Sequence, residues 1–365
     1  MADAQLFVDI IEHYRLIQNM DLFQELTSMS SNNREMIKTT CPRDCYDACG
    51  IVAVKDNGKL RKIMGDPTHK PTGGALCGKC AIAYNGVFTD HNSRLLTPLK
   101  RAGSKGEAQF VAISWTEAIS LIKDKIKPLL ENSEHSHIYH THYTGTVSLI
   151  AGWYPIRFFN RIGATEVDPD SVCNKAGHEA LTYMFGASEE GFDPRTLKDA
   201  KCIIVWGANP SHTAPHQNKR WLMQADIPII SIDPIAHATA KASDVHLQLK
   251  PGSDAALAFC FMNIARREGL IDDQYLAENS IGFEELEESI NAATSERTAL
   301  LTGLSVDDIE MVGKIYAKGP SMIWLGQGLQ RQPRGGNVFR AIATLCVATG
   351  NISKPGTGFC YMNGR

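Results

Sequence analysis

CPRDCYDACG at residues 41–50 and GGALCGKC at residues 73–80 are the two stretches that organise this sequence. They carry a run of three cysteines and a later pair, namely Cys41, Cys45, Cys49, Cys77 and Cys80. Three thiolates from one tight run and one distant thiolate are typical ligands of a [4Fe–4S] cluster. We predict the three cysteines of the run and Cys77 as the ligands, with Cys80 as a bystander or an alternative ligand.

Two other interpretations of these cysteines are a structural zinc site and disulfide bonds. A structural zinc ion prefers two C-x2-C pairs, and only Cys77 and Cys80 have that spacing. Disulfides are typical of short secreted domains, whereas this sequence is long and shows no secretory signal. The iron–sulfur cluster is therefore the favoured prediction.

The composition is that of a globular protein with more than one domain. The chain has 365 residues, of which 43% are hydrophobic and 21% are charged, and this length allows a large buried core. A net charge of -3 at pH 7 argues against nucleic acid or an anionic membrane as the main partner. The N-terminal stretch MADAQLFVDIIEHYRL has no basic region and no long apolar run, so we expect no export signal, no membrane span and a cytoplasmic location.

Sequence patterns divide the chain into three parts. Residues 1–35 carry apolar side chains at helical spacing and are predicted to form an N-terminal helical extension. Residues 36–100 are predicted to form the iron–sulfur domain, with a β-hairpin turning at Asn57-Gly58. Residues 101–365 are predicted to form an α/β region.

A helix is predicted to begin after Ser114, because Glu117 follows three residues later and completes a capping-box pattern. Its apolar residues, from Trp115 to Ile126, fall on one stripe that we expect to be buried.

The α/β region alternates strands and helices. Buried apolar stretches such as CIIVW at residues 202–206 and PIISI at residues 228–232 are separated by helical patterns. This order is typical of βαβ units with a mostly parallel, doubly wound sheet and helices on both faces.

Polar or glycine-rich residues follow three of the expected strands, where open α/β sheets bind ligands. Gly207 permits close approach of a phosphate-bearing ligand, and Asn209 offers both a donor and an acceptor. Asp233 can accept hydrogen bonds from a ribose or a guanine edge, and Gly326-Gln327-Gly328 ends the third strand. Each signal alone is weak, because strand-to-helix turns often contain glycine or asparagine.

The cysteine run resembles the N-terminal cluster motif of the molybdenum/tungsten bis-pterin oxidoreductases, the family of formate dehydrogenases, nitrate reductases and thiosulfate or polysulfide reductases. In that family a C-x2/3-C-x3-C run is followed by L-C-x-K-G. This chain has Leu76, Cys77, Gly78 and Lys79, and then Cys80 in place of the usual glycine. The resemblance implies that Lys79 lies between the cluster and a pterin, on the path of electrons.

Five further motifs resemble the family's dinucleotide loops in the same order. They are WGANP, SIDP with Thr239 and Asp244, KPGSDAALA, GQGLQR and TGNISKPGTG. The resemblance implies a molybdopterin guanine dinucleotide, carrying Mo or W, held by Gly207, Asn209, Asp233, Gly252, Asp254 and Gly328. One departure is Ile235-Ala236-His237, where the family usually has an arginine after Asp-Pro.

Cys173 falls where the family supplies the side-chain ligand of the metal, and a thiolate suits a soft Mo or W centre. The resemblance to formate dehydrogenases is incomplete here. They have a histidine after the ligand and an arginine after the T-G-N segment, whereas this sequence has Asn174 and Asn363.

The resemblance implies the catalytic chain of a formate dehydrogenase-like oxidoreductase with a small-molecule substrate and an electron-transfer partner subunit. Family members are longer and end in a β-barrel that closes over the pterins, so we expect that barrel to be absent. Either the chain is a fragment, or a separate chain supplies the C-terminal half. A sulfur-compound or oxyanion reductase of the same family is the first alternative. A catalytically incomplete electron-transfer or assembly module is the alternative from another class.

Overall fold

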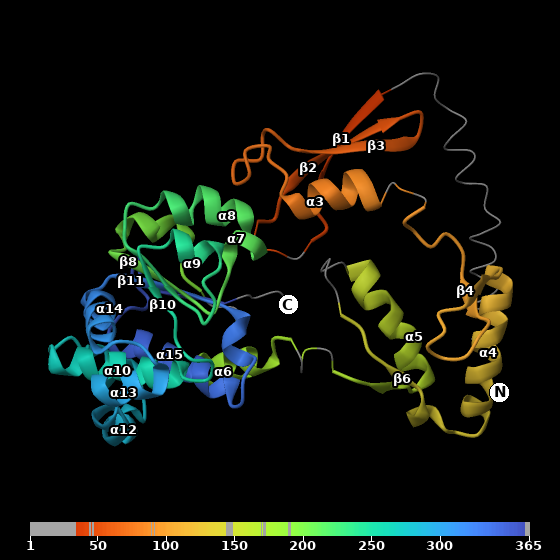
Figure 1. Ribbon diagram of the computed structural model, residues 1–365. Helices are drawn as coiled ribbons and strands as arrows, with labels where there is room; N and C mark the ends of the chain where they lie inside the picture. Colours follow the sequence, from red (N-terminus) through yellow and green to blue (C-terminus); the bar gives the residue numbers. More distant parts are fainter. Residues whose placement is uncertain are drawn as a thin grey trace. The chain divides into compact units, whose positions relative to one another are not determined.

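The computed structural model describes residues 34–361 (Figure 1), apart from residues 44, 46, 89, 91, 144–148, 169, 171–172 and 189–190. The chain forms two compact units, one made of residues up to 44 and 48–169 and the other of residues 45–47 and 170–365. The predicted N-terminal extension and Asn363 lie outside the described residues, and the predicted domain bounds stay predictions. No helix in the described part of the chain is long and apolar enough to span a membrane.

The first unit contains a three-stranded antiparallel sheet of order β1-β2-β3. The hairpin prediction is confirmed, because β2 pairs with β3 around Asn57 and Gly58 at φ 49° and 77°, as a tight hairpin turn requires. Strand β1 was not predicted, since all seven of its residues are exposed and their sequence, REMIKTT, gives no buried face to detect. The strands are β1 (Arg34–Thr40), β2 (Gly50–Asp56) and β3 (Lys59–Gly65).

A short helix packs against this sheet (Figure 1). Helix α3 (Gly78–Ile82) runs directly into a π-helical turn, η1 (Ala83–Val87). Buried residues of both elements meet Ile51 and Ile63 of the sheet in one apolar cluster. Three of its six buried members, Cys49, Cys77 and Cys80, come from the two cysteine stretches.

The remainder of the first unit consists of short elements and one long helix, α4 (Trp115–Glu131). The capping prediction is confirmed, since Ser114 Oγ accepts a hydrogen bond from Glu117 N at 3.1 Å. The predicted burial of the apolar stripe is wrong: no residue of α4 is buried, and Trp115 is 52% exposed. Periodicity predicts a helix with an apolar face, but that face is buried only where another element packs on it, and none of the described elements does so here. The other elements are β4 (Leu99–Arg101), β5 (Phe110–Ala112), η2 (His135–His137), β6 (Tyr139–His140), η3 (Leu149–Trp153), α5 (Tyr154–Ile162) and β7 (Thr165–Glu166).

The second unit is built on a parallel sheet of order β10-β9-β8-β11-β12, which confirms the predicted α/β class. The first strand of this sheet along the chain is β8. The next two, β9 and β10, lie on one side of it, and β11 lies on its other side. The strand order therefore reverses between β8 and β11, and open α/β sheets bind ligands at such a switch point. The strands are β8 (Cys202–Trp206), β9 (Ile229–Ile232), β10 (Val245–Leu247), β11 (Ser321–Leu325) and β12 (Gly358–Cys360).

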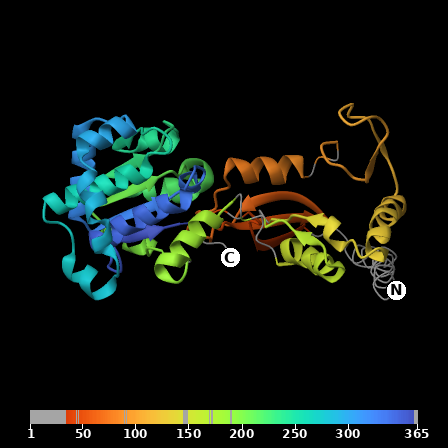
Figure 2. The same cartoon turned by 90° about the horizontal axis from the view of Figure 1, so that it is seen from below.

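Helices lie on both sides of the sheet (Figure 2), and alternate residues of the strands belong to different cores. In β8, Ile204 and Trp206 belong to the larger core, whereas Ile203 and Val205 belong to the smaller one. Long helices form the larger core and short turns cover the other face. The helices are α6 (Lys175–Phe185), α7 (Pro210–Thr213), α8 (Pro215–Arg220), α9 (Ala238–Ala242), α10 (Asp254–Arg267), α11 (Asp273–Asn279), α12 (Glu287–Ala292), α13 (Ser295–Thr302), α14 (Val306–Lys318) and α15 (Gly335–Ala348), with single turns η5 (Pro194–Asp199), η6 (Leu222–Gln224), η7 (Phe283–Leu286) and η8 (Gln327–Gln330).

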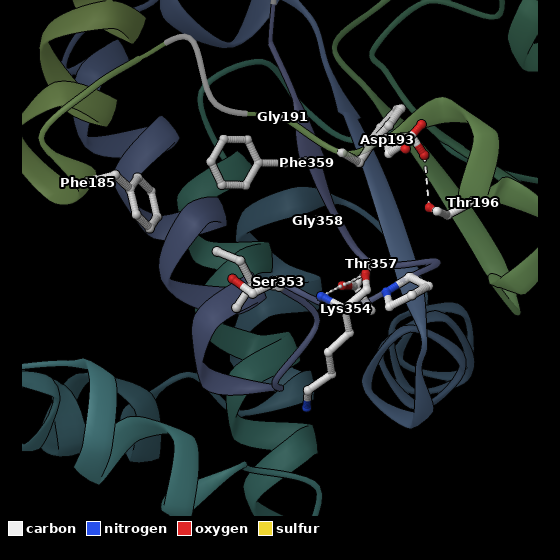
Figure 3. A pocket seen from close by; sticks show the side chains of 12 residues that line it. Phe185, Gly191, Asp193, Thr196, Ser353, Lys354, Thr357, Gly358 and Phe359 are labelled. Atoms are coloured by element: carbon white, nitrogen blue, oxygen red, sulfur yellow. Dashed lines mark hydrogen bonds between the residues drawn. The ribbon is translucent and has the colours of Figure 1, made fainter.

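A hollow of about 560 Å³ lies beside β12, between aromatic side chains such as Phe185 and Phe359 and the polar Asp193 and Lys354 (Figure 3). Its loop, residues 352–357, precedes β12. The hollow is therefore at the amino end of the strand, away from the carboxyl edge where parallel sheets bind ligands.

Candidate functional site

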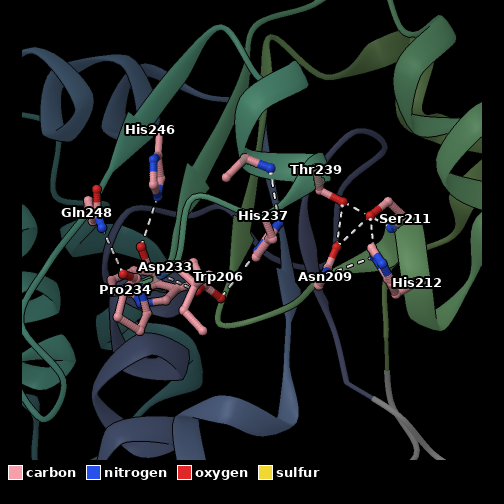
Figure 4. A network of polar contacts seen from close by, with 12 residues as sticks. Trp206, Asn209, Ser211, His212, Asp233, Pro234, His237, Thr239, His246 and Gln248 are labelled. Atoms are coloured by element: carbon pink, nitrogen blue, oxygen red, sulfur yellow. Dashed lines mark hydrogen bonds and ion pairs between the residues drawn. The ribbon is translucent and has the colours of Figure 1, made fainter.

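The first strand end positions Asn209. Gly207 follows β8 at φ 63°, a left-handed conformation that favours glycine. Asn209 Oδ1 accepts hydrogen bonds from Ser211 Oγ at 2.6 Å and from Thr239 Oγ1 at 3.2 Å (Figure 4). Thr239 belongs to α9, so the loops after β8 and β9 are tied together at the edge of the sheet.

Asp233 ends β9 and is 8% exposed. Its Oδ1 accepts from Ile235 N at 2.8 Å, and its Oδ2 lies 3.4 Å from His237 Nε2 (Figure 4). His237 Nδ1 accepts from Ala240 N at 3.1 Å, so the ring proton is on Nε2 and faces the carboxylate. An imidazole thus stands beside Asp233 in the segment where the resemblance expects arginine.

Glycines at the switch point bring the loops after β8 and β11 into backbone contact. Gly326 N donates to Trp206 O at 2.8 Å. A Cβ at Gly326 would lie 1.8 Å from Gly207 O, and one at Gly328 would lie 2.9 Å from the same oxygen. Only glycine fits at Gly326, and the two loops form a backbone surface that a phosphate-bearing ligand can approach.

Gly252 and Asp254 lie at the start of α10. Gly252 takes φ 90°, again a glycine conformation. Asp254 is buried and both of its carboxylate oxygens are used by the protein, since Trp206 Nε1 donates at 2.9 Å and Gln332 Nε2 at 3.0 Å. Asp254 therefore braces the strand-end loops.

Cys173 lies just before α6 and beside the loop that follows β11. Gln330 Nε2 donates to Cys173 O, and Gln327 Nε2 donates to Asn174 Oδ1 at 2.6 Å. The Cys173 thiol donates to the same Asn174 oxygen at 3.4 Å. The structure therefore brings Cys173 together with the Gly-Gln-Gly strand end, although more than 150 residues separate them.

Gln330 and Tyr361 are part of this arrangement and were not predicted. Gln330 is buried; its Oε1 accepts from Gly177 N at 2.8 Å and its Nε2 donates to Tyr361 OH at 2.9 Å. Tyr361 OH in turn donates to Asn174 O at 3.4 Å, and burial raises the pKa of this phenol. The amide in GQGLQR was a weak signal for Gln330, whereas no pattern marked Tyr361.

The first unit gathers four of the five thiols of the cysteine stretches. Cys49, Cys77 and Cys80 are buried in the apolar cluster, and Cys41 packs against them. Cys41 N donates to Cys49 O at 2.8 Å, and the sulfurs of Cys41 and Cys80 are 3.3 Å apart. Cys45 is assigned to the second unit. No disulfide joins any of these five cysteines.

The chain thus contains two structural features: a thiol cluster in residues 41–80 and, later in the sequence, a glycine-lined switch point in residues 207–328. Residues 35–87 match the molybdopterin oxidoreductase Fe4S4 domain, and residues 94–363 match the molybdopterin oxidoreductase model. The chain belongs to the molybdopterin oxidoreductase family. The two matched domains indicate a molybdopterin cofactor and a 4Fe–4S cluster.

The relatives of this chain within the molybdopterin oxidoreductase family are named for different activities. The chain is 35% identical to "Probable oxidoreductase YoaE" of Bacillus subtilis, covering 91% of this chain and 49% of that protein. It is 29% identical to the F420-dependent formate dehydrogenase subunit alpha of Methanocaldococcus jannaschii (91% and 48% covered) and 28% identical to the assimilatory nitrate reductase catalytic subunit of Bacillus subtilis (90% and 46% covered). The chain spans about half the length of these curated relatives.

The fold is also that of a solved structure, acetylene hydratase from Pelobacter acetylenicus. The TM-score is 0.69 at 24% identity, over 88% of this chain and 44% of the other. At this identity the likeness shows the fold alone.

The residue types found in the two parts of the chain fit the two cofactors that the family model indicates. Converging thiols are the donor set of an iron–sulfur cluster, and a glycine-lined switch point is typical of a dinucleotide site. Lys79, predicted to lie between the two cofactors, is exposed on α3.

Proposed function

We propose that this chain is the catalytic part of a formate dehydrogenase-like molybdopterin enzyme that transfers electrons through a [4Fe–4S] cluster to a partner subunit. The cofactor would be molybdopterin guanine dinucleotide with Mo or W, and it would supply the two-electron chemistry. The observation that carries the proposal is the contact between the Cys173 loop and the strand end at Gln327 and Gln330. A metal ligand and a dinucleotide loop would then belong to one site.

The residues of the second unit would bind and orient the cofactor. Gly207 and Gly328 would let the dinucleotide phosphates approach the backbone, with Gly252 at the rim. Asn209 and Asp233 would offer polar groups to the ribose and the guanine. Asp254 would act by holding Trp206 and Gln332 in place.

The remaining predicted residues would serve the metal and the electron path. Cys173 would bind Mo or W as a thiolate. Cys41, Cys45, Cys49 and Cys77 would hold the cluster, and Lys79 would lie on the electron path.

The second candidate is reduction of an oxyanion or sulfur compound, and Asn174 is the observation that favours it. Asn174 is 5% exposed and is fixed by Gln327 and by the Cys173 thiol. A carboxamide can orient an oxygen-bearing substrate but cannot accept the proton that leaves formate, because amides do not act as bases at neutral pH. Turnover of formate against turnover of nitrate by the same preparation separates the two candidates.

Metal and sulfide analysis of the anaerobically purified protein tests the proposed cofactors. We expect about four irons and four sulfides per chain, together with Mo or W. Iron and sulfide without Mo or W would instead support an electron-transfer or assembly module. Zinc as the only metal would contradict both.

Replacing Cys173 with alanine is expected to abolish turnover while the iron content stays at the wild-type level. The thiolate would be lost from the metal, whereas three of the proposed cluster ligands, Cys41, Cys49 and Cys77, lie in the other unit of the chain. Cys360→Ala, which removes another partly buried thiol of the second unit, is the matched control and should retain activity. Wild-type turnover in Cys173→Ala would exclude this residue as the metal ligand.

A further inference from the structure

The sulfur of Cys41 has two close neighbours within its own unit. Cys80 Sγ lies 3.3 Å away, and Tyr84 OH lies 3.3 Å away on the helical segment that follows. Four residues separate Cys80 from Tyr84, so both side chains leave the same face of α3 and η1. Both are buried, with 2% of Cys80 and 8% of Tyr84 exposed.

The protonation states of the three groups differ once iron is bound. A cysteine that binds iron is a thiolate and can only accept a hydrogen bond. A thiol or a phenol that binds no metal ordinarily carries its proton at neutral pH. Cys80 and Tyr84 can therefore donate across the two 3.3 Å contacts, and the Cys41 thiolate can accept.

We propose that Cys80 and Tyr84 are hydrogen-bond donors to the Cys41 thiolate and raise the reduction potential of the cluster. This inference rests on the proposed function only in taking Cys41 as a cluster ligand. It assigns Cys80 a role other than that of a fourth or alternative ligand. Cys77, another predicted ligand, belongs to the same buried cluster as Cys80.

The sign of the effect follows from the charge on the cluster. The reduced cluster carries one more negative charge than the oxidised cluster, so a donated hydrogen bond stabilises the reduced state more. Hydrogen bonds to the sulfurs are one of the factors that set iron–sulfur potentials. Removing either donor should therefore lower the potential.

The test is a potentiometric titration of the purified full chain, followed by EPR of the reduced cluster. Tyr84→Phe removes the hydroxyl and keeps the ring, and Cys80→Ala removes the thiol. Each variant should keep the wild-type iron and sulfide content and titrate at a lower potential. We expect the ratio of reduced to oxidised cluster at a fixed potential to fall up to tenfold, which is about 59 mV for one electron.

Two controls separate hydrogen bonding from general damage. Tyr139→Phe makes the same chemical change at a tyrosine of the same unit that is 68% exposed, and its potential should equal that of the wild type. Cys80→Ser restores a donor and should recover part of the shift seen in Cys80→Ala.

Two results would overturn the inference. One is an unchanged potential in both Tyr84→Phe and Cys80→Ala with four irons retained. The other is loss of iron in Cys80→Ala together with its retention in Cys77→Ala, because Cys80 would then be the ligand. An absence of iron from the wild-type protein would instead contradict the proposed function, and it is measured before any variant is made.

Discussion

Gly326→Ala is expected to lower the free energy of unfolding of the second unit by about 3 kcal/mol. The added Cβ would lie 1.8 Å from Gly207 O and 2.6 Å from the Cα of Ala208. Both neighbours are backbone atoms of a loop that follows the fully buried strand β8, so neither can turn away as a side chain would. The loops after β8 and β11 would have to separate at the switch point.

Urea unfolding followed by tryptophan fluorescence measures this change, because Trp206 and Trp324 lie in the core of the second unit. Gly269→Ala is the control for adding a Cβ in open space. Gly326 has φ -100°, a conformation that alanine adopts without strain, so its loss comes from the close contact. Gly269 has φ 66° and nothing within 4 Å of its Cβ position, so its variant loses only the backbone preference of about 1 kcal/mol. Equal losses in the two variants would show that the close approach at the switch point contributes nothing.

Gln330→Leu is expected to release the loop that carries Cys173. The substitution removes the hydrogen bonds from Gln330 to Cys173 O and Tyr361 OH and the bond from Gly177 N. Leucine has about the same volume, but the buried backbone groups at both ends of the loop would lose their partners, which costs about 2 kcal/mol. We expect lower stability and a several-fold faster alkylation of Cys173 by iodoacetamide in cofactor-free protein.

The alkylation rate is read at Cys173 by peptide mass spectrometry. Gln274→Leu is the control, since Gln274 lies on an exposed helix and bonds only to Glu278 in the part of the chain that the structure describes. It should change neither quantity. An unchanged alkylation rate in Gln330→Leu would mean that the hydrogen bonds of Gln330 do not hold the Cys173 loop in place.

Sequence patterns predicted the local elements well where their side chains are buried. The continuously apolar CIIVW stretch is β8, all five residues of which are buried, and Asn57-Gly58 turns the hairpin at positive φ as expected. The pattern did not detect β1, because an exposed strand needs no alternation. The predicted burial of α4 was also wrong. An apolar stripe shows which face of a helix can be buried, but it does not show whether another element packs on that face.

Some of the site residues could be predicted from the sequence and others could not. Glycines such as Gly207 and Gly326 were visible at the strand ends, since a backbone that must come close to another leaves glycine as the only choice. Gln330, Tyr361 and Tyr84 were not visible, because a lone amide or phenol in a sequence has no spacing rule. Their roles exist only through partners more than thirty residues away.

The sequence by itself determined the residue types and their order: five cysteines within two short stretches, and glycine or amide residues at the ends of parallel strands. Spacing along the chain encodes such local chemistry directly. The tertiary structure alone decided which of these groups meet. It placed Cys80 and Tyr84 on the sulfur of Cys41, and Gln330 on the carbonyl of Cys173. Packing of distant segments sets these contacts, and no local pattern records it.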